Sequence, residues 1–150
     1  MEVFNIRKEK FSKSLVASGI ANRWNKKEEF VIYTGSNRAL STLEMVVHRS
    51  YILSSIPYTL LTIEVKESEG FLKEIKTEDL PENWRSIEAY PVLQDIGSKW
   101  YNLKESLVLK VPSAIIPREF NYIINTKHSL FETDVKIVEV ADFIWDERLL

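Results

Sequence analysis

Four polar residues of different chemistry stand out because each lies in an apolar or aromatic stretch of the chain. They are Arg23, Tyr33, Glu44 and Ser113. A polar group in such surroundings is costly to bury unless something binds it. A cation, a phenol ring, a carboxylate and a hydroxyl that share one cleft would suit a charged ligand containing a sugar. We therefore expect these four side chains to converge on one ligand site.

Glu44 lies inside a predicted helix over residues 38–48. The apolar residues of this segment recur at helical spacing and form one stripe: Ala39, Leu40, Leu43, Val46 and Val47. On a helical wheel Glu44 lies about 40° from Leu40, at the margin of the stripe. A carboxylate at that margin can point along the rim of the core into a cleft. Ser36 or Asn37 is suited to cap the start of the helix.

The other candidates belong to strand patterns. Tyr33 lies in an apolar, β-branched run over 30–34, and Ser113 follows a strand over 106–111 that Pro112 ends. The run over 58–65 is nearly all apolar, which predicts a strand buried on both faces. The remaining predicted elements are strands over 3–6 and 135–140, a surface hairpin or loop over 66–76, and helices over 80–84, with Asp79 as cap, and 90–100. Because helices and strands alternate irregularly, an α+β fold is favoured over a doubly wound sheet.

Composition excludes several classes of protein. The 150 residues fit a single domain, 1–150, with a formal net charge of −2, which disfavours direct binding of nucleic acid. There is no cysteine, and the two histidines, His48 and His128, are far apart, so we expect no metal site. We find no pattern typical of a signal peptide and no apolar run of about 20 residues that could span a membrane. We therefore expect a soluble, cytoplasmic protein without membrane association.

A set of short motifs, in a shared order and spacing, resembles the RES domain family. The motifs are Phe4-Asn5-Ile6, Arg23-Trp24-Asn25, Val31-Ile32-Tyr33-Thr34, the helix over 39–48, Leu80-Pro81-x-x-Trp84, Gln94-x-x-Gly97-x-x-Trp100, Val111-Pro112-Ser113-Ala114, Asn121-Tyr122-x-x-Asn125-x-x-His128 and Asp146-x-Arg148-Leu149. The chain departs from the family pattern before and after Arg23-Trp24-Asn25. Ala21-Asn22 stand where glycines are usual, and residues 26–29 replace a turn with proline and glycine.

The resemblance implies an ADP-ribosyltransferase-like α+β domain, with a split or mixed β-core and flanking helices that cradle NAD⁺. It implies a toxin that uses NAD⁺ as substrate, without a metal, and cleaves the bond between nicotinamide and ribose. The acceptor of the ADP-ribose is water, phosphate or a protein side chain. The resemblance further implies an Xre-family antitoxin as partner and is compatible with a homodimer of the toxin.

Within this resemblance we assign catalytic roles to Glu44 and Arg23. Glu44 would accept a hydrogen bond from the ribose and stabilise the positive charge that develops there. Arg23 would bind the diphosphate or ribose oxygens. Tyr33 would stack on nicotinamide, and Ser113 would bind its amide or a ribose oxygen. Asn25 is a further candidate for ligand contact.

Each assignment has a structural alternative. Arg23 could form a salt bridge, Tyr33 could be a core tyrosine, and Ser113, like Asn121, could cap a turn. Glu44 could be a solvated helix residue that pairs with Arg38 or His48. A second functional class is a catalytically silent domain that only binds a partner, which the altered segment 26–29 permits.

Overall fold

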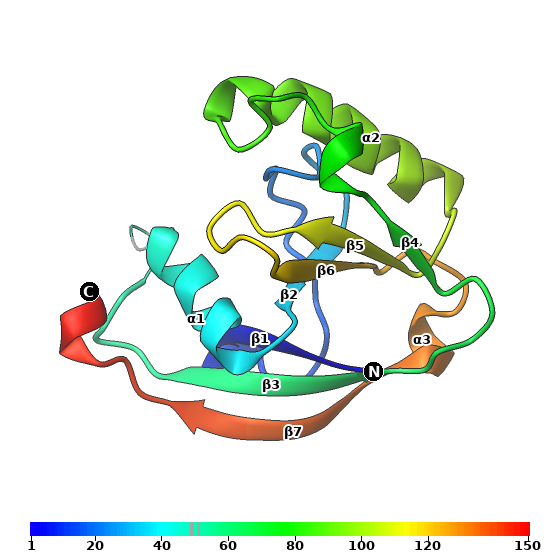
Figure 1. Cartoon of the computed structure of the whole chain (residues 1–150). Coiled ribbons are helices and arrows are strands. Elements are labelled where there is room, and N and C mark those ends of the chain that lie inside the picture. Colours follow the sequence, from blue (N-terminus) through cyan, green and yellow to red (C-terminus); the bar gives the residue numbers. More distant parts are fainter. Residues whose placement is uncertain (49, 51) are drawn as a thin grey trace.

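The computed structural model describes residues 1–48, 50 and 52–150 (Figure 1). The strands are β1 (Glu2–Lys8), β2 (Val31–Gly35), β3 (Tyr58–Val65), β4 (Leu72–Glu74), β5 (Val108–Pro112), β6 (Phe120–Asn125) and β7 (Val135–Phe143). The helices are α1 (Arg38–Val47), α2 (Tyr90–Leu103) and α3 (Phe131–Asp134), with short 3₁₀ helices η1 (Glu9–Phe11), η3 (Thr77–Asp79), η4 (Ile87–Ala89) and η5 (Glu147–Leu149). None of the helices in the described ranges is both long and apolar enough to cross a membrane.

In the described part of the chain, seven strands form one sheet in the order β4-β5-β6-β2-β1-β3-β7. Only β4 and β5 pair in parallel, so the sheet is mixed. The pairing between β1 and β2 is reduced to one position, Phe4 opposite Gly35, whereas β1 pairs with β3 along its whole length. The sheet is therefore split into two halves at this point, and the predicted α+β fold with a split, mixed β-core is confirmed.

Each half of the sheet carries its own helix. Figure 1 shows α1 over β1 and β3, and α2 over β5 and β6. Met45 of α1 packs on a buried cluster of β1 and β3 residues: Phe4, Ile6, Tyr58 and Leu60. Leu93 and Trp100 of α2 pack with Leu109 and Ile123 of the other half. The two helices thus flank the split in the sheet.

Most predicted elements are confirmed, but the helix over 80–84 is wrong. The short helix η3 ends just before this segment, at Asp79, and Leu80 is extended, with φ −102° and ψ 156°. The cause is Pro81, because a residue that precedes proline is disfavoured in the helical region. Residues 81–84 form a turn, in which the N–H of Trp84 donates to the carbonyl of Pro81 (3.0 Å). The segment 66–76, predicted as a hairpin or loop, also contributes the edge strand β4.

Gly97 lets α2 approach the segment that carries Arg23. A Cβ atom at this position would collide with the backbone carbonyl group of Trp24. Beside this contact, the side-chain amide of Gln94 donates a hydrogen bond of 2.9 Å to the carbonyl of Asn22. The loop before β2 is therefore held directly against the helix backbone.

We predict that Gly97→Ala destabilises the protein by about 1–3 kcal/mol, the usual cost of overpacking. Helix propensity alone would give the opposite sign, because alanine is favoured over glycine by about 1 kcal/mol in a helix interior. Urea unfolding measures the change, with Lys99→Ala at an exposed position of α2 as the control. An increase in stability for Gly97→Ala would show that the helix does not need the close contact.

Candidate functional site

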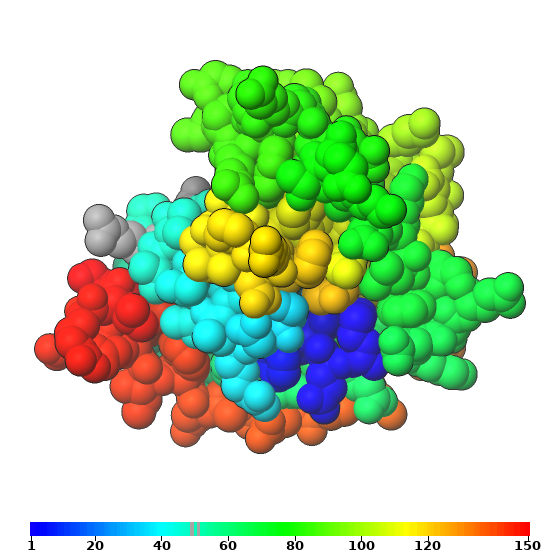
Figure 2. All heavy atoms as spheres, viewed as in Figure 1, coloured from blue at the N-terminus to red at the C-terminus, as the bar shows by residue number. Residues whose placement is uncertain are grey.

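Two adjoining cavities lie where the sheet splits. One has a volume of about 150 Å³ and the other of about 400 Å³. Both are lined by the same five residues: Asn22, Tyr33, Glu44, His48 and Asn121. The larger cavity also reaches Arg23, Tyr90 and Ile87. Figure 2 shows on this face that α1 (cyan) lies against the connection between β5 and β6 (yellow), with the segment leading into α2 (green) above them.

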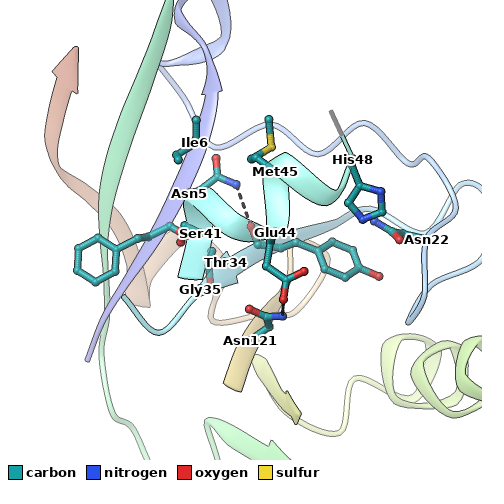
Figure 3. Close-up of a pocket in the computed structure, with 12 residues that line it drawn as sticks. Asn5, Ile6, Asn22, Thr34, Gly35, Ser41, Glu44, Met45, His48 and Asn121 are labelled. Carbon is teal, nitrogen blue, oxygen red and sulfur yellow. Dashed lines mark hydrogen bonds between the residues drawn. The ribbon is translucent and has the colours of Figure 1, made fainter. Parts of the chain in front are cut away.

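Glu44 projects from α1 toward the start of β6 (Figure 3). The helix begins where predicted, because the side chain of Asn37 caps it by accepting a hydrogen bond from the backbone N–H of Leu40. The half-buried carboxylate of Glu44 accepts hydrogen bonds at Oε1 from Ser113 Oγ (3.0 Å) and Asn121 Nδ2 (2.6 Å). No described residue donates to its second oxygen, Oε2. Glu44 is therefore partly buried, and one of its two carboxylate oxygens receives no hydrogen bond from the described residues.

Ser113 follows β5 and is 2% exposed. Its hydroxyl donates to Glu44 and accepts hydrogen bonds of 3.1 Å from the backbone N–H groups of Ile115 and Ile116. The hydroxyl therefore caps a turn, as the structural alternative anticipated, and also holds the carboxylate. A direct contact between Ser113 and a ligand stays a prediction.

Arg23 lies at the wall of the larger cavity. Its Nη1 donates to the carbonyls of Trp84 (3.0 Å) and Arg85 (3.1 Å), and its guanidinium lies 4.7 Å from the centre of the Tyr90 ring. Among the described residues no carboxylate lies within 4.0 Å of its nitrogens. The alternative of a salt bridge is thus not observed, and the positive charge is left without an acidic partner beside a cavity.

The phenol of Tyr33 joins β2 to the Arg23 loop. Its hydroxyl donates to Asn25 Oδ1 (2.8 Å) and accepts from the backbone N–H of Trp24 (3.0 Å). Burial raises the pKa of the Tyr33 phenol above its ordinary value of 10.0. The phenol therefore stays neutral, and its ring lines both cavities.

Asn25 is buried beneath the site, with 1% of its surface exposed. Its amide nitrogen lies within hydrogen-bonding distance of the carbonyls of Ile20, Lys26 and Glu29. It lines neither cavity. The structure thus gives Asn25 the task of shaping the loop that carries Arg23, and ligand contact by Asn25 stays a prediction.

Several residues that complete the site carry only weak signals in the sequence. Asn121, whose pattern is typical of turn capping, lies in β6 and donates to Glu44. Asn5 of β1 donates across the split to the carbonyl of Tyr33 (2.8 Å) and accepts from Arg7 (2.6 Å). His48 lies one helical turn after Glu44 and lines both cavities. Such contacts join distant segments, which local sequence patterns do not reveal.

No group of three or more histidine, aspartate or glutamate side chains in the described ranges is arranged to hold a metal ion. The polar side-chain groups around the cavities instead include a guanidinium, an imidazole, amides, two phenols, two aliphatic hydroxyls and one carboxylate. This set is suited to binding an anion and sugar hydroxyls.

Comparison with known proteins gives the family. A family model described as the RES domain matches residues 6–146. This chain belongs to the RES domain family. The resemblance carried by the short motifs is therefore confirmed, and Arg23, Tyr33, Glu44 and Ser113 all lie within the matched region.

The relatives in this family are named as toxins. A protein of Yersinia enterocolitica named Toxin Res is 35% identical over 133 residues, covering 89% of this chain and 86% of the relative. A protein of Sphingobium sp. named Prs ADP-ribosylating toxin is 33% identical over 129 residues, covering 85% of this chain and 80% of the relative.

A solved structure shares the fold seen here. The crystal structure of the M. tuberculosis MbcT–MbcA toxin–antitoxin complex matches with a TM-score of 0.74. The match covers 95% of this chain and 84% of the solved chain at 15% identity, and so shows the fold. The α+β fold expected from the resemblance is thereby confirmed.

We predict that Tyr33→Phe lowers the free energy of unfolding by about 1–3 kcal/mol at pH 7, because it leaves Trp24 N–H and Asn25 Oδ1 without the hydroxyl. Since the pKa of Tyr33 is raised in the folded state, the wild type should lose stability as the pH rises above about 10, where the unfolded phenol ionises. In denaturant unfolding, the difference in the free energy of unfolding between the wild type and Tyr33→Phe should therefore become smaller above this pH. A constant difference would contradict the assigned burial of the phenol.

Proposed function

We propose that this protein is a toxin that consumes NAD⁺ by cleaving the bond between nicotinamide and ribose. The observation that carries the proposal is the carboxylate of Glu44. One oxygen is held by two protein donors, and the other has no donor among the described residues and belongs to a side chain that lines both cavities. The guanidinium of Arg23, which has no carboxylate partner among the described residues, lines the larger cavity and supplies a charge that suits the diphosphate.

The reaction requires stabilisation of a cationic sugar. When the N-glycosidic bond breaks, positive charge moves from the nicotinamide ring onto the ribose, which becomes oxocarbenium-like. A fixed carboxylate stabilises that charge without reorganising during the reaction. In the proposal Glu44 faces the ribose, Arg23 holds the diphosphate and the Tyr33 ring stacks on nicotinamide.

The acceptor of the ADP-ribose is proposed to be water or phosphate, as in an NAD⁺ glycohydrolase or phosphorylase, because these need no surface for docking a protein substrate. A protein acceptor is the second candidate, favoured by the Sphingobium relative named an ADP-ribosylating toxin. In either case the site would act on cytoplasmic NAD⁺. A catalytically silent domain is the candidate of another class, and it would release no nicotinamide.

We predict that Glu44→Gln lowers nicotinamide release from NAD⁺ by at least about a hundredfold, as expected for loss of one preorganised electrostatic group. Glutamine keeps the size of the side chain, so the thermal unfolding temperature should change little. Glu132→Gln, at an exposed position of α3, is the matched control and should keep full activity. Activity of Glu44→Gln equal to the wild type would remove Glu44 from the chemistry.

The same assay separates the acceptors. NAD⁺ labelled in the adenylate part is incubated with the protein, with and without phosphate, and with a cell extract. ADP-ribose would indicate water, ADP-ribose 1″-phosphate would indicate phosphate, and label on a protein band would indicate protein transfer. No release of nicotinamide under any condition would favour the silent domain.

We further propose that an Xre-type antitoxin covers the mouth of the larger cavity. Two aliphatic side chains that line this cavity are exposed, Val47 (60%) and Ile87 (78%). Apolar side chains gathered in one exposed patch mark sites of protein interaction. The structural neighbour, solved as a toxin–antitoxin complex, supports an antitoxin as partner.

We predict that Ile87→Asp weakens binding of the proposed antitoxin by at least tenfold, because it places an unpaired charge in an apolar contact. Titration calorimetry measures the affinity. Ile144→Asp, at an equally exposed isoleucine (89%) of the C-terminal segment, should bind as the wild type does. Equal affinity for both variants would place the antitoxin elsewhere.

A further inference from the structure

Asn121 is held in an orientation that leaves half of its amide unused. Its Nδ2 donates to Glu44 Oε1 at 2.6 Å, the shorter of the two hydrogen bonds to that carboxylate. Its Oδ1 is buried and has no hydrogen-bond partner among the described residues. A buried carbonyl without a partner is costly and calls for an explanation.

The chemistry of the pair fixes this orientation. An ionised carboxylate only accepts hydrogen bonds, so the amide must present its nitrogen to Glu44. Turning the amide by half a turn would place two oxygens against each other. The hydrogen bond to Glu44 therefore sets the orientation of the Asn121 amide, although this orientation leaves Oδ1 without a partner among the described residues.

The fixed amide of Asn121 in turn holds the carboxylate of Glu44 in place. Asn121 Nδ2 and Ser113 Oγ both reach Oε1, from the start of β6 and from the end of β5. The two strands are paired, with Val111 opposite Asn121, so the donors form a rigid pair. Two donors on one oxygen fix the plane of the carboxylate and leave Oε2 for the ligand.

We propose that Asn121 is a positioning residue for the reaction, acting through Glu44 rather than on the ligand. The inference rests on the proposed function, and adds that the amide determines which oxygen of Glu44 faces the ribose. Loss of the amide should lower kcat by about ten- to a hundredfold with little change in KM, since misplaced catalytic groups cost rate more than binding.

The kinetic test compares four proteins in the nicotinamide-release assay: wild type, Asn121→Ala, Asn121→Asp and Tyr122→Phe. Tyr122 is the neighbouring residue of β6, its hydroxyl makes no hydrogen bond among the described residues, and its variant should keep the kcat of the wild type. Asn121→Ala should lower kcat. Asn121→Asp places a second carboxylate beside Glu44, which raises the pKa of the pair. When the solution is acidified, this variant should therefore lose its remaining activity at a higher pH than the wild type does. An unchanged kcat and pH profile for both Asn121 variants would overturn the proposal.

A second measurement does not depend on turnover. A double-mutant cycle of Glu44→Ala and Asn121→Ala, in which each substitution removes one partner of the hydrogen bond, should show in urea unfolding a coupling of about tenfold or more in the unfolding equilibrium constant. In the swapped variant, Glu44→Gln with Asn121→Asp, the amide and the carboxylate exchange places. This variant should regain the stability lost in Asn121→Asp but release no nicotinamide.

The two measurements distinguish failure of the proposed function from failure of the positioning role of Asn121. Coupling without any nicotinamide release by the wild type would reject the proposed function and retain Asn121 as the residue that positions Glu44. Absence of coupling would reject the positioning role whatever the activity. Recovery of activity in the swapped variant would also reject it, because the carboxylate would then not need to lie on α1.

Discussion

The separation of β1 from β2 is the feature on which the site depends. The two strands pair at Phe4 and Gly35 and then diverge, so backbone groups along the split need other partners. Side chains provide them: Ser41 Oγ of α1 lies 3.0 Å from the carbonyl of Phe4, and Asn5 donates to the carbonyl of Tyr33. The cavity beside Glu44 thus exists because side chains, instead of a neighbouring strand, satisfy the backbone there. Gly35 allows this arrangement, since a Cβ atom would lie 3.0 Å from the backbone nitrogen of Ser41.

A separate set of contacts fixes the position of Arg23, the cationic residue of the site. The Tyr33 hydroxyl accepts a hydrogen bond from the backbone N–H of Trp24, and Gly97 allows that backbone to lie against α2. Trp84 contributes one of the two carbonyls to which Arg23 donates. Trp24 and Trp84 belong to the same buried cluster as α2. The position of the guanidinium is therefore a result of core packing, although the guanidinium itself lines a cavity. This explains how Arg23 can keep a fixed place although none of the described carboxylates pairs with it.

Local patterns predicted the elements and part of the site. The helical stripe placed Glu44 at the margin of the core, where the structure finds it half-buried, and Asn37 was one of two predicted caps. The pairing of Glu44 with Asn121 spans 77 residues of sequence and depends on the register of β6, which no local pattern fixes. Likewise the role of Gly97 appears only when α2 meets Trp24. The polar Asn121 in an otherwise largely apolar strand was the one available signal, and it is also typical of a turn.

The segment 26–29, where the chain departs from the family pattern, bears on whether the site is intact. In place of a turn with proline and glycine, the carboxylate of Glu29 accepts from the backbone N–H of Lys26 and from the amide of Asn102, and Lys26 pairs with Asp95 of α2 at 2.6 Å. Glu28 adopts a φ of +65°, a conformation that costs a non-glycine residue about 1–2 kcal/mol, while its N–H binds the carbonyl of Gly19. The replaced turn is thus tied to α2 by contacts of its own. Asn25 and Tyr33, which lie beside the altered segment, are hydrogen-bonded to each other. The altered segment therefore does not displace Arg23 from the site. The argument for a silent domain would then have to come from the chemistry at Glu44 and not from the shape of this loop.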